Sequence, residues 1–155
     1  MLIESSLAFS NGRASQLLRE EGVDVFELLQ AASLHFTPGC ASEMKRHFKA
    51  ALSDKGFAID IVPDAPLGWR VQALSRSGIA IQFEFGNLAN AMYDILKFGH
   101  LFNVGRVNQV LLVAPMQSAA KVLGGNIACF EKLEREYLLA FDALVATPLE
   151  LIGIR

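Results

Sequence analysis

Hydrophobic residues in the first quarter of the chain recur at helical spacing. Between residues 13 and 36, leucines and valines return every three or four positions, which predicts helices with one buried face. Gly22 interrupts the pattern, and Asp24 is placed to cap a second helix. Thr37-Pro38-Gly39 ends the stretch. We therefore expect residues 1–40 to form a helical extension ahead of the main fold.

After one more amphipathic helix, the pattern becomes that of β-strands. β-Branched and aromatic residues cluster in three short runs, at residues 57–62, 69–74 and 79–85. Ser75-Arg76-Ser77-Gly78 has the composition of a tight turn. The second and third runs are therefore expected to form an antiparallel hairpin.

The remaining chain alternates between helices and strands. Asn87 is placed to cap a helix over residues 88–102, whose apolar residues form one stripe. Residues 107–113 are continuously apolar, as expected for a strand buried on both faces. Gly124-Gly125-Asn126 precedes a final long helix, and residues 149–154 form a last short strand.

This order predicts an α/β domain with an αβββαβ core, in which a mixed central sheet is flanked by helices. The 155 residues fit a single domain. We expect the core to occupy residues 41–115, after the N-terminal helical extension. A C-terminal helix and strand are expected within residues 116–155.

Composition narrows the class of protein. Hydrophobic residues make up 52% of the chain and charged residues 19%, which excludes a disordered protein. We expect a cytoplasmic protein without a membrane partner, because no apolar run could span a bilayer and the start does not resemble a signal peptide. Cys40 and Cys129 show no metal-ligand spacing and are expected to be reduced thiols. The net charge of −2 argues against broad coating of nucleic acid, but not against a local DNA site.

The third predicted strand carries the most informative polar residues. Side chains two positions apart on a strand point to the same face, so Gln82 and Glu84 should project together. The apolar residues between and beside them, Ile81, Phe83 and Phe85, should face the other way. Two polar groups on one face just before a helix suit a metal site, and they also suit any half-exposed strand.

These residues belong to a longer pattern. The stretch from Gly78 to Asn87, the elements Tyr93-Asp94 and Leu96-Lys97-Phe98, and the strand ending at Pro115 resemble the BglII-type restriction endonuclease family. In that family a glycine-led strand carries a Glu-x-Gln pair and ends in Gly-Asn. The similarity extends from about Glu43 to the C-terminus. It implies the PD-(D/E)XK nuclease fold and a homodimer that cleaves duplex DNA with Mg²⁺ and no small-molecule cofactor.

The resemblance also implies roles for particular residues. In such enzymes, carboxylates from the second and third strands hold the metal, which activates water. Glu84 and Gln82 are therefore catalytic candidates, and Glu84 is a metal ligand. Their order reverses the Glu-x-Gln pair, although the related BamHI subgroup has acids at both positions. The second-strand aspartate of the family aligns with Ala73 or Gln72, and neither residue is charged.

Three other acids are candidates for the missing anion. Asp64 follows Pro63 as in the Pro-Asp signature and is a catalytic and metal-binding candidate, although it falls in the loop after the first strand, where a turn aspartate is common. Asp60 lies within that strand and is a further candidate ligand. Glu43 is another, and its alternative role is to complement a helix dipole.

Lys97, Lys45 and Arg46 are candidates for contact with DNA phosphates, and solvated helix faces are the alternative for all three. Three functions remain open. The first is a type II restriction endonuclease-like enzyme, whose altered catalytic pair raises the question of impaired or lost activity. The second is an inactive nuclease-fold protein that binds DNA or a protein partner. The third is a ligand-binding or assembly domain that shares only the element order.

Overall fold

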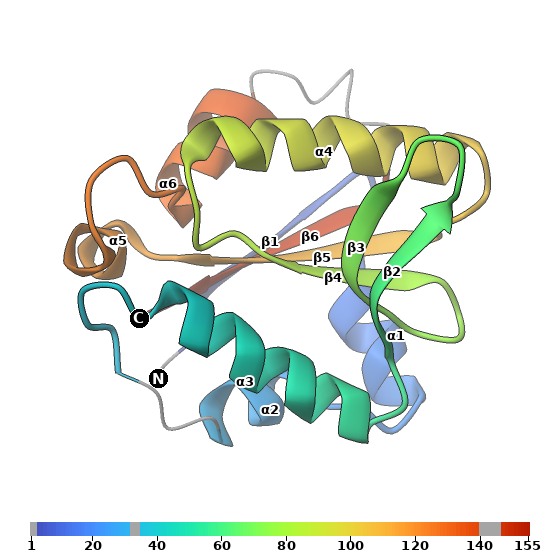
Figure 1. Cartoon of the computed structure of the whole chain (residues 1–155), viewed down its shortest axis with the longest axis horizontal. Helices are drawn as coiled ribbons and strands as arrows, with labels where there is room; N and C mark the ends of the chain where they lie inside the picture. Colours follow the sequence, from blue (N-terminus) through green and yellow to red (C-terminus); the bar gives the residue numbers. More distant parts are fainter. Residues whose placement is uncertain (1–2, 32–34, 140–146) are drawn as a thin grey trace.

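Helices cover both faces of a central β-sheet (Figure 1). The computed structural model describes residues 3–31, 35–139 and 147–155, and within them the sheet has six strands in the order β1-β6-β5-β4-β3-β2. The strands are β1 (Ile3–Phe9), β2 (Ala58–Asp64), β3 (Trp69–Leu74), β4 (Ile79–Phe83), β5 (Gln109–Pro115) and β6 (Leu149–Ile154). The helices are α1 (Ala14–Glu20), α2 (Val25–Ala31), α3 (Ala41–Asp54), α4 (Leu88–Asn103), α5 (Gln117–Leu123) and α6 (Phe130–Lys132), the last of which continues into a π-helix (Leu133–Leu138).

The predicted αβββαβ core is confirmed. It runs from α3 through β2, β3 and β4 to α4 and β5. The pairs β2–β3 and β3–β4 are antiparallel, whereas β4–β5 and β5–β6 are parallel, so the sheet is mixed. Gly78 (φ 84°) completes the predicted turn between β3 and β4, because this left-handed backbone conformation suits glycine. Asn87 caps α4 as predicted, since its Oδ1 accepts a hydrogen bond from Ala89 N at 2.7 Å.

The N-terminal part differs from the expected helical extension. The two predicted helices are present as α1 and α2, and Asp24 Oδ1 accepts hydrogen bonds from two backbone N–H groups at the start of α2. However, β1 precedes them and pairs antiparallel with β6 at the edge of the sheet. The sequence also did not predict α5. The expected long C-terminal helix extends over α6 and the π-helix, and its later part lies outside the described residues.

The two faces of the sheet bury separate hydrophobic cores. In Figure 1, α4 and α6 lie above the strands, and α1, α2 and α3 lie below them. The lower core joins Met44, Phe48 and Leu52 of α3 to Ile81, Phe83, Leu111 and Val113 of the sheet. The upper core joins Ile95, Phe98 and Leu101 of α4 to Val110, Leu112 and Leu151. Neighbouring residues of β5 thus alternate between the two cores, as expected for a strand covered on both faces.

No helix among the described residues combines the length and the apolar character needed to cross a bilayer.

Glu150 on β6 is a buried carboxylate that fixes the beginning of α1. Its two oxygens accept hydrogen bonds from Ser15 N at 2.8 Å and Ser15 Oγ at 2.7 Å. Ser6 Oγ on β1 donates a third hydrogen bond at 3.1 Å. A negative charge beside the first turn of a helix is also favourable for the helix dipole. Glu150 therefore joins β6, β1 and α1, three elements that are distant in the sequence.

We expect Glu150→Ala to lower the free energy of unfolding by about 3 kcal/mol, because three part-buried hydrogen bonds from Ser15 and Ser6 lose their charged acceptor. Urea denaturation measures this change. The matched control is Glu4→Ala on β1, whose partially exposed carboxylate pairs with Arg155 and should contribute less than about 1 kcal/mol. Equal stability of the two variants would show that the Glu150 hydrogen bonds are unimportant for the fold.

Candidate functional site

Gln82 and Glu84 face α4 from the carboxyl end of β4. Gln82 Nε2 donates a hydrogen bond to Asp94 Oδ2 on α4 at 2.6 Å, and Glu84 also lies in hydrogen-bonding contact with Asp94. Glu84 follows the last residue of β4, but its backbone N still donates to Val113 O of β5 at 2.8 Å. The neighbouring apolar side chains of Ile81, Phe83 and Phe85 belong to the core on the opposite face. The predicted orientation of this segment is therefore confirmed.

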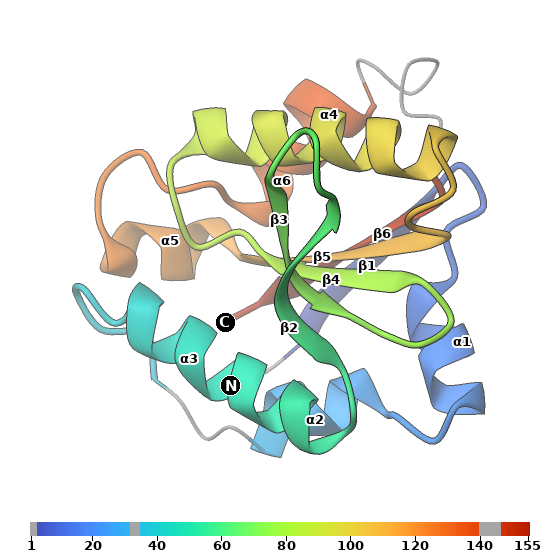
Figure 2. The same ribbon diagram turned by 45° about the vertical axis from the view of Figure 1, so that its right-hand side comes forward.

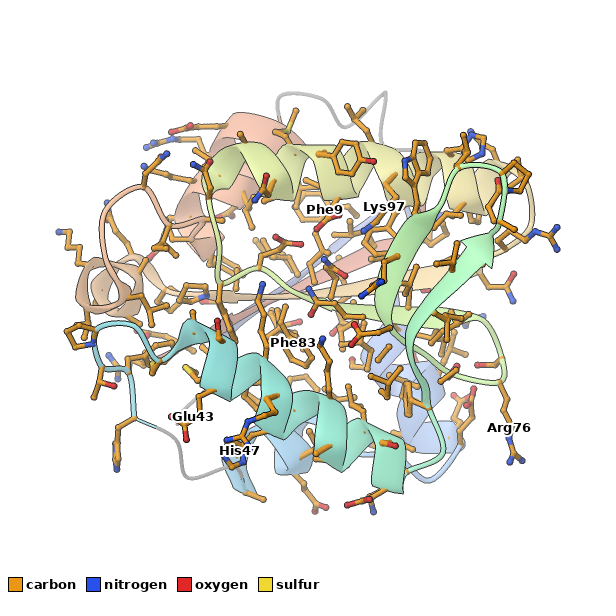
Figure 3. All side chains as sticks on the ribbon, viewed as in Figure 1. Phe9, Glu43, His47, Arg76, Phe83 and Lys97 are labelled. Carbon is orange, nitrogen blue, oxygen red and sulfur yellow. The ribbon has the colours of Figure 1, made fainter. Side chains whose placement is uncertain are left out.

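Glu84 and Asp94 bring two carboxyl groups together in a nearly dry environment. Glu84 is 3% exposed, and the Asp94 side chain is 13% exposed. Lys97, one turn further along α4, contacts Asp94 Oδ1 through Nζ and also donates a hydrogen bond to the backbone O of Arg70 at 3.0 Å. Lys97 lies between α4 and the strands in Figure 3. Its charge partly balances Asp94, and its second hydrogen bond ties α4 to β3.

Burial raises the pKa of Glu84 from its ordinary 4.5 to about 8. The adjacent Asp94 carboxylate adds to the rise through its charge and through the hydrogen bond, whereas Lys45 and Lys97 oppose it. Near neutral pH, Glu84 in the metal-free protein is mostly protonated, and its hydroxyl donates to Asp94. Burial also lowers the pKa of Lys45 on α3, while Glu84 and Asp94 raise it.

A cavity of about 490 Å³ opens beside this pair of carboxyl groups. Gln82 and Asp94 lie on its wall, and four basic residues surround them, Lys45 and Lys49 from α3, Arg70 from β3 and Lys97 from α4. Trp69 and Tyr93 form a further part of the wall, with their rings in an edge-to-face arrangement at 6.1 Å. The cavity therefore combines oxygen ligands with a positive rim.

Two oxygens of the site have no hydrogen-bond partner among the described residues. They are Gln82 Oε1 and Glu84 Oε1, and both atoms are buried. Buried polar atoms in proteins are usually satisfied, and an unsatisfied one costs about 1–3 kcal/mol. Two open acceptors in the same cluster therefore indicate a place for a positively charged or hydrogen-bond-donating ligand.

The other candidate acids do not join Glu84. Asp60 lies on the cavity wall, but its carboxylate accepts two hydrogen bonds from Lys49 Nζ, at 2.8 and 2.9 Å. Asp64 lies near the tip of the β2–β3 hairpin, which reaches α4 in Figure 2, and its Oδ2 is 3.3 Å from His100 Nε2. Glu43 is 60% exposed and lies on the outer side of α3 (Figure 3).

The β3 residues that align with the family's second-strand aspartate also provide no anion. Ala73 is fully buried in the lower core. Gln72 Oε1 accepts a hydrogen bond from Phe83 N at 3.1 Å, and its Nε2 donates to Phe83 O at 3.4 Å, so its amide is occupied by β4. Across residues 3–31, 35–139 and 147–155, no three His, Cys, Asp or Glu side chains are positioned to share a metal ion.

The three predicted phosphate-binding residues have different positions. Lys97 and Lys45 line the cavity, whereas Arg46 is exposed on α3, 3.8 Å from Glu43. Asp94 is the member of the site to which the sequence pattern assigned no role. Asp94 lies three residues before Lys97, a spacing that predicts an ion pair on one face of a helix. The spacing does not show that this face packs against Gln82 and Glu84.

The raised pKa of Glu84 predicts a loss of stability with increasing pH in the metal-free protein. The unfolded chain releases the Glu84 proton near pH 4.5 and the folded chain near pH 8, so ionisation favours unfolding between these values. Each unit of pKa shift corresponds to about 1.4 kcal/mol. In EDTA, the unfolding free energy of wild type should fall relative to that of Glu84→Gln from pH 5 to pH 8. Parallel pH profiles for the two proteins would contradict a raised pKa.

Comparison with known proteins identifies the scaffold. Residues 10–154 match the protein family described as restriction endonuclease BglII/BglIII. The crystal structure of free BglII has a TM-score of 0.69 to this chain at 15% sequence identity, over 100% of this chain and 80% of that chain. It shares the fold, a mixed six-stranded sheet flanked by helices. No curated protein has a matching sequence. Because the family match spans nearly the whole chain, this protein belongs to the BglII/BglIII family of restriction endonucleases.

Proposed function

We propose that this protein hydrolyses phosphodiester bonds of duplex DNA with the help of Mg²⁺, and that it acts as a cytoplasmic homodimer. The observation that carries the proposal is the pair of buried oxygens without a partner among the described residues, Gln82 Oε1 and Glu84 Oε1, beside a basic cavity of a restriction endonuclease scaffold. Glu84 resembles the acid that BamHI-type relatives have at this position, and Gln82 departs from the family pattern.

The oxygen donors of the site fit Mg²⁺. This ion prefers oxygen ligands and is usually held by one or two carboxylates, with water and substrate phosphate completing its shell. Glu84 and Gln82 would hold it through the oxygens that lack a partner among the described residues. When bound, Mg²⁺ supplies a Lewis acid for phosphate oxygen and lowers the pKa of a water molecule.

Basic residues of the cavity wall would bind and orient the DNA backbone. Lys45 and Lys49 from α3 and Arg70 from β3 bring positive charge to the cavity wall. Charge-assisted contacts of this kind position a phosphate without reading sequence. Lys97 stays buried and holds Asp94 instead of reaching the surface. The site thus has an outer layer that attracts phosphate and an inner layer of acidic and amide oxygens.

A second candidate is an inactive nuclease-fold protein that binds DNA or a protein partner. One observation favours it, the uncharged Ala73 and Gln72 on β3, at the position where the family has its second-strand aspartate. Fewer free anions would lower the affinity for a hard cation. DNA binding without cleavage is the behaviour that separates this candidate from the enzyme.

Cleavage of supercoiled plasmids of varied sequence, with Mg²⁺ or Mn²⁺, tests the enzymatic proposal. Glu84→Gln should lower the cleavage rate on the order of 10²–10³-fold, as when one electrostatic contact to a transition state is removed. Glu43→Gln, on the exposed side of α3, is the control and should retain the wild-type rate. Absence of cleavage by wild type on all substrates, with folding intact, would exclude the enzyme.

DNA binding can be measured separately through Trp69, the single tryptophan of the chain and part of the cavity wall. We expect duplex oligonucleotides to change its fluorescence in EDTA, and Lys45→Ala to weaken binding with a smaller dependence on salt. Arg46→Ala removes a neighbouring charge outside the cavity and should have a smaller effect. If Lys45→Ala binds DNA like wild type, the positive rim is not the phosphate site.

A further inference from the structure

The proposed metal site lacks a second carboxylate from the sheet. Nuclease sites of this fold are expected to combine an anion from the second strand with one from the third, and here β3 provides none. Glu84 alone would give a single carboxylate, and Gln82 adds only a neutral amide oxygen. Asp60 pairs with Lys49 on α3 and Asp64 lies beside His100, and neither carboxylate is in hydrogen-bonding contact with Glu84. We therefore searched the described residues for another acid that lies beside Glu84.

Asp94 meets the geometric requirement from a different element. It projects from α4, and one of its oxygens accepts the 2.6 Å hydrogen bond from Gln82 Nε2. It also lies in hydrogen-bonding contact with Glu84 and on the wall of the solvent-accessible cavity. Asp94 and Gln82 thus line the cavity, and Glu84 lies directly behind them in contact with Asp94.

The surroundings hold Asp94 in this position. Lys97 contacts its Oδ1 and is itself fixed by the backbone O of Arg70, at 3.0 Å. Lys97, the middle of this short chain of contacts, is 4% exposed, and its bonds to Asp94 and to the Arg70 backbone are part-buried. A carboxylate that is held by packing and by outer hydrogen bonds loses little freedom when it binds a cation, which favours binding.

We propose that Asp94 supplies, from α4, the second carboxylate of a divalent-metal site, in place of an acid on β3. This inference rests on the proposed function and specifies the ligand set of the same site, Glu84, Asp94 and the amide oxygen of Gln82. Two buried acceptors beside Asp94, Gln82 Oε1 and Glu84 Oε1, have no partner among the described residues. Bound metal satisfies both.

Metal binding without DNA provides a direct test. Electron paramagnetic resonance measures the affinity for Mn²⁺ of four proteins: wild type, Asp94→Asn, Glu84→Gln and Asp60→Asn. The Asp94→Asn side chain keeps an oxygen that can accept from Gln82 Nε2 but has no charge, so this variant should bind Mn²⁺ at least tenfold more weakly, as should Glu84→Gln. Asp60→Asn, which removes an acid bound by Lys49 on the same cavity wall, should bind as wild type. Asp94→Glu should recover part of the affinity, because the charge returns.

Wild-type protein gives an independent measurement that needs no substitution. Fe²⁺ in place of Mg²⁺, with ascorbate and peroxide, generates radicals that cut the chain close to the bound ion. Cuts near residues 82–84 and near residue 94 are the expected result. Cuts near residues 60–64 without cuts near residue 94 would overturn the proposal, as would wild-type Mn²⁺ affinity in Asp94→Asn.

Failure of this inference is distinguishable from failure of the proposed function. If wild type binds Mn²⁺ and cleaves DNA while Asp94→Asn binds Mn²⁺ normally, the enzyme stands and Asp94 is only a partner of Lys97 and Gln82. If wild type neither binds Mn²⁺ nor cleaves DNA, the proposed metal-dependent nuclease is excluded, and the role of Asp94 as a ligand with it.

Discussion

The site depends on holding two carboxyl groups against each other across the boundary between a sheet and a helix. Glu84 extends from the carboxyl end of β4, and Asp94 approaches from α4. Such a pair is unfavourable when both groups are charged in a dry environment, and the protein offsets the cost with a proton on Glu84 and with Lys97. The parallel pairing of β4 with β5 and the packing of α4 on that face fix the distance between the two groups.

Much of the fold follows from local patterns in the sequence. The αβββαβ order, the β3–β4 hairpin and the caps at Asp24 and Asn87 depend on periodicity and turn composition, which act over a few residues. The strand β1 could not be found in this way. It contains two serines, its sequence alternates only weakly between apolar and polar residues, and its partner β6 lies at the other end of the chain. Such an edge strand is stabilised by long-range pairing and by Glu150.

Only the part of the site that lies on a single strand was predicted from the sequence. The shared face of Gln82 and Glu84 follows from the two-residue period of a strand, and the structure has it. Asp94 could not be assigned because its contact with this strand depends on how α4 is rotated above the sheet, which no single sequence pattern specifies. Asp64 illustrates the opposite case. A matching dipeptide suggested chemistry, but the hairpin places that aspartate beside His100, on a different part of α4.

The hydrogen bond from Lys97 to Arg70 has an evolutionary consequence. Its acceptor is a main-chain oxygen, which every amino acid at position 70 would provide. Substitutions at position 70 therefore preserve the hydrogen bond between β3 and α4. The side chain at this position lines the cavity and can change with the ligand. Ligand specificity at the cavity wall can thus evolve without loss of the main-chain contact that positions Lys97.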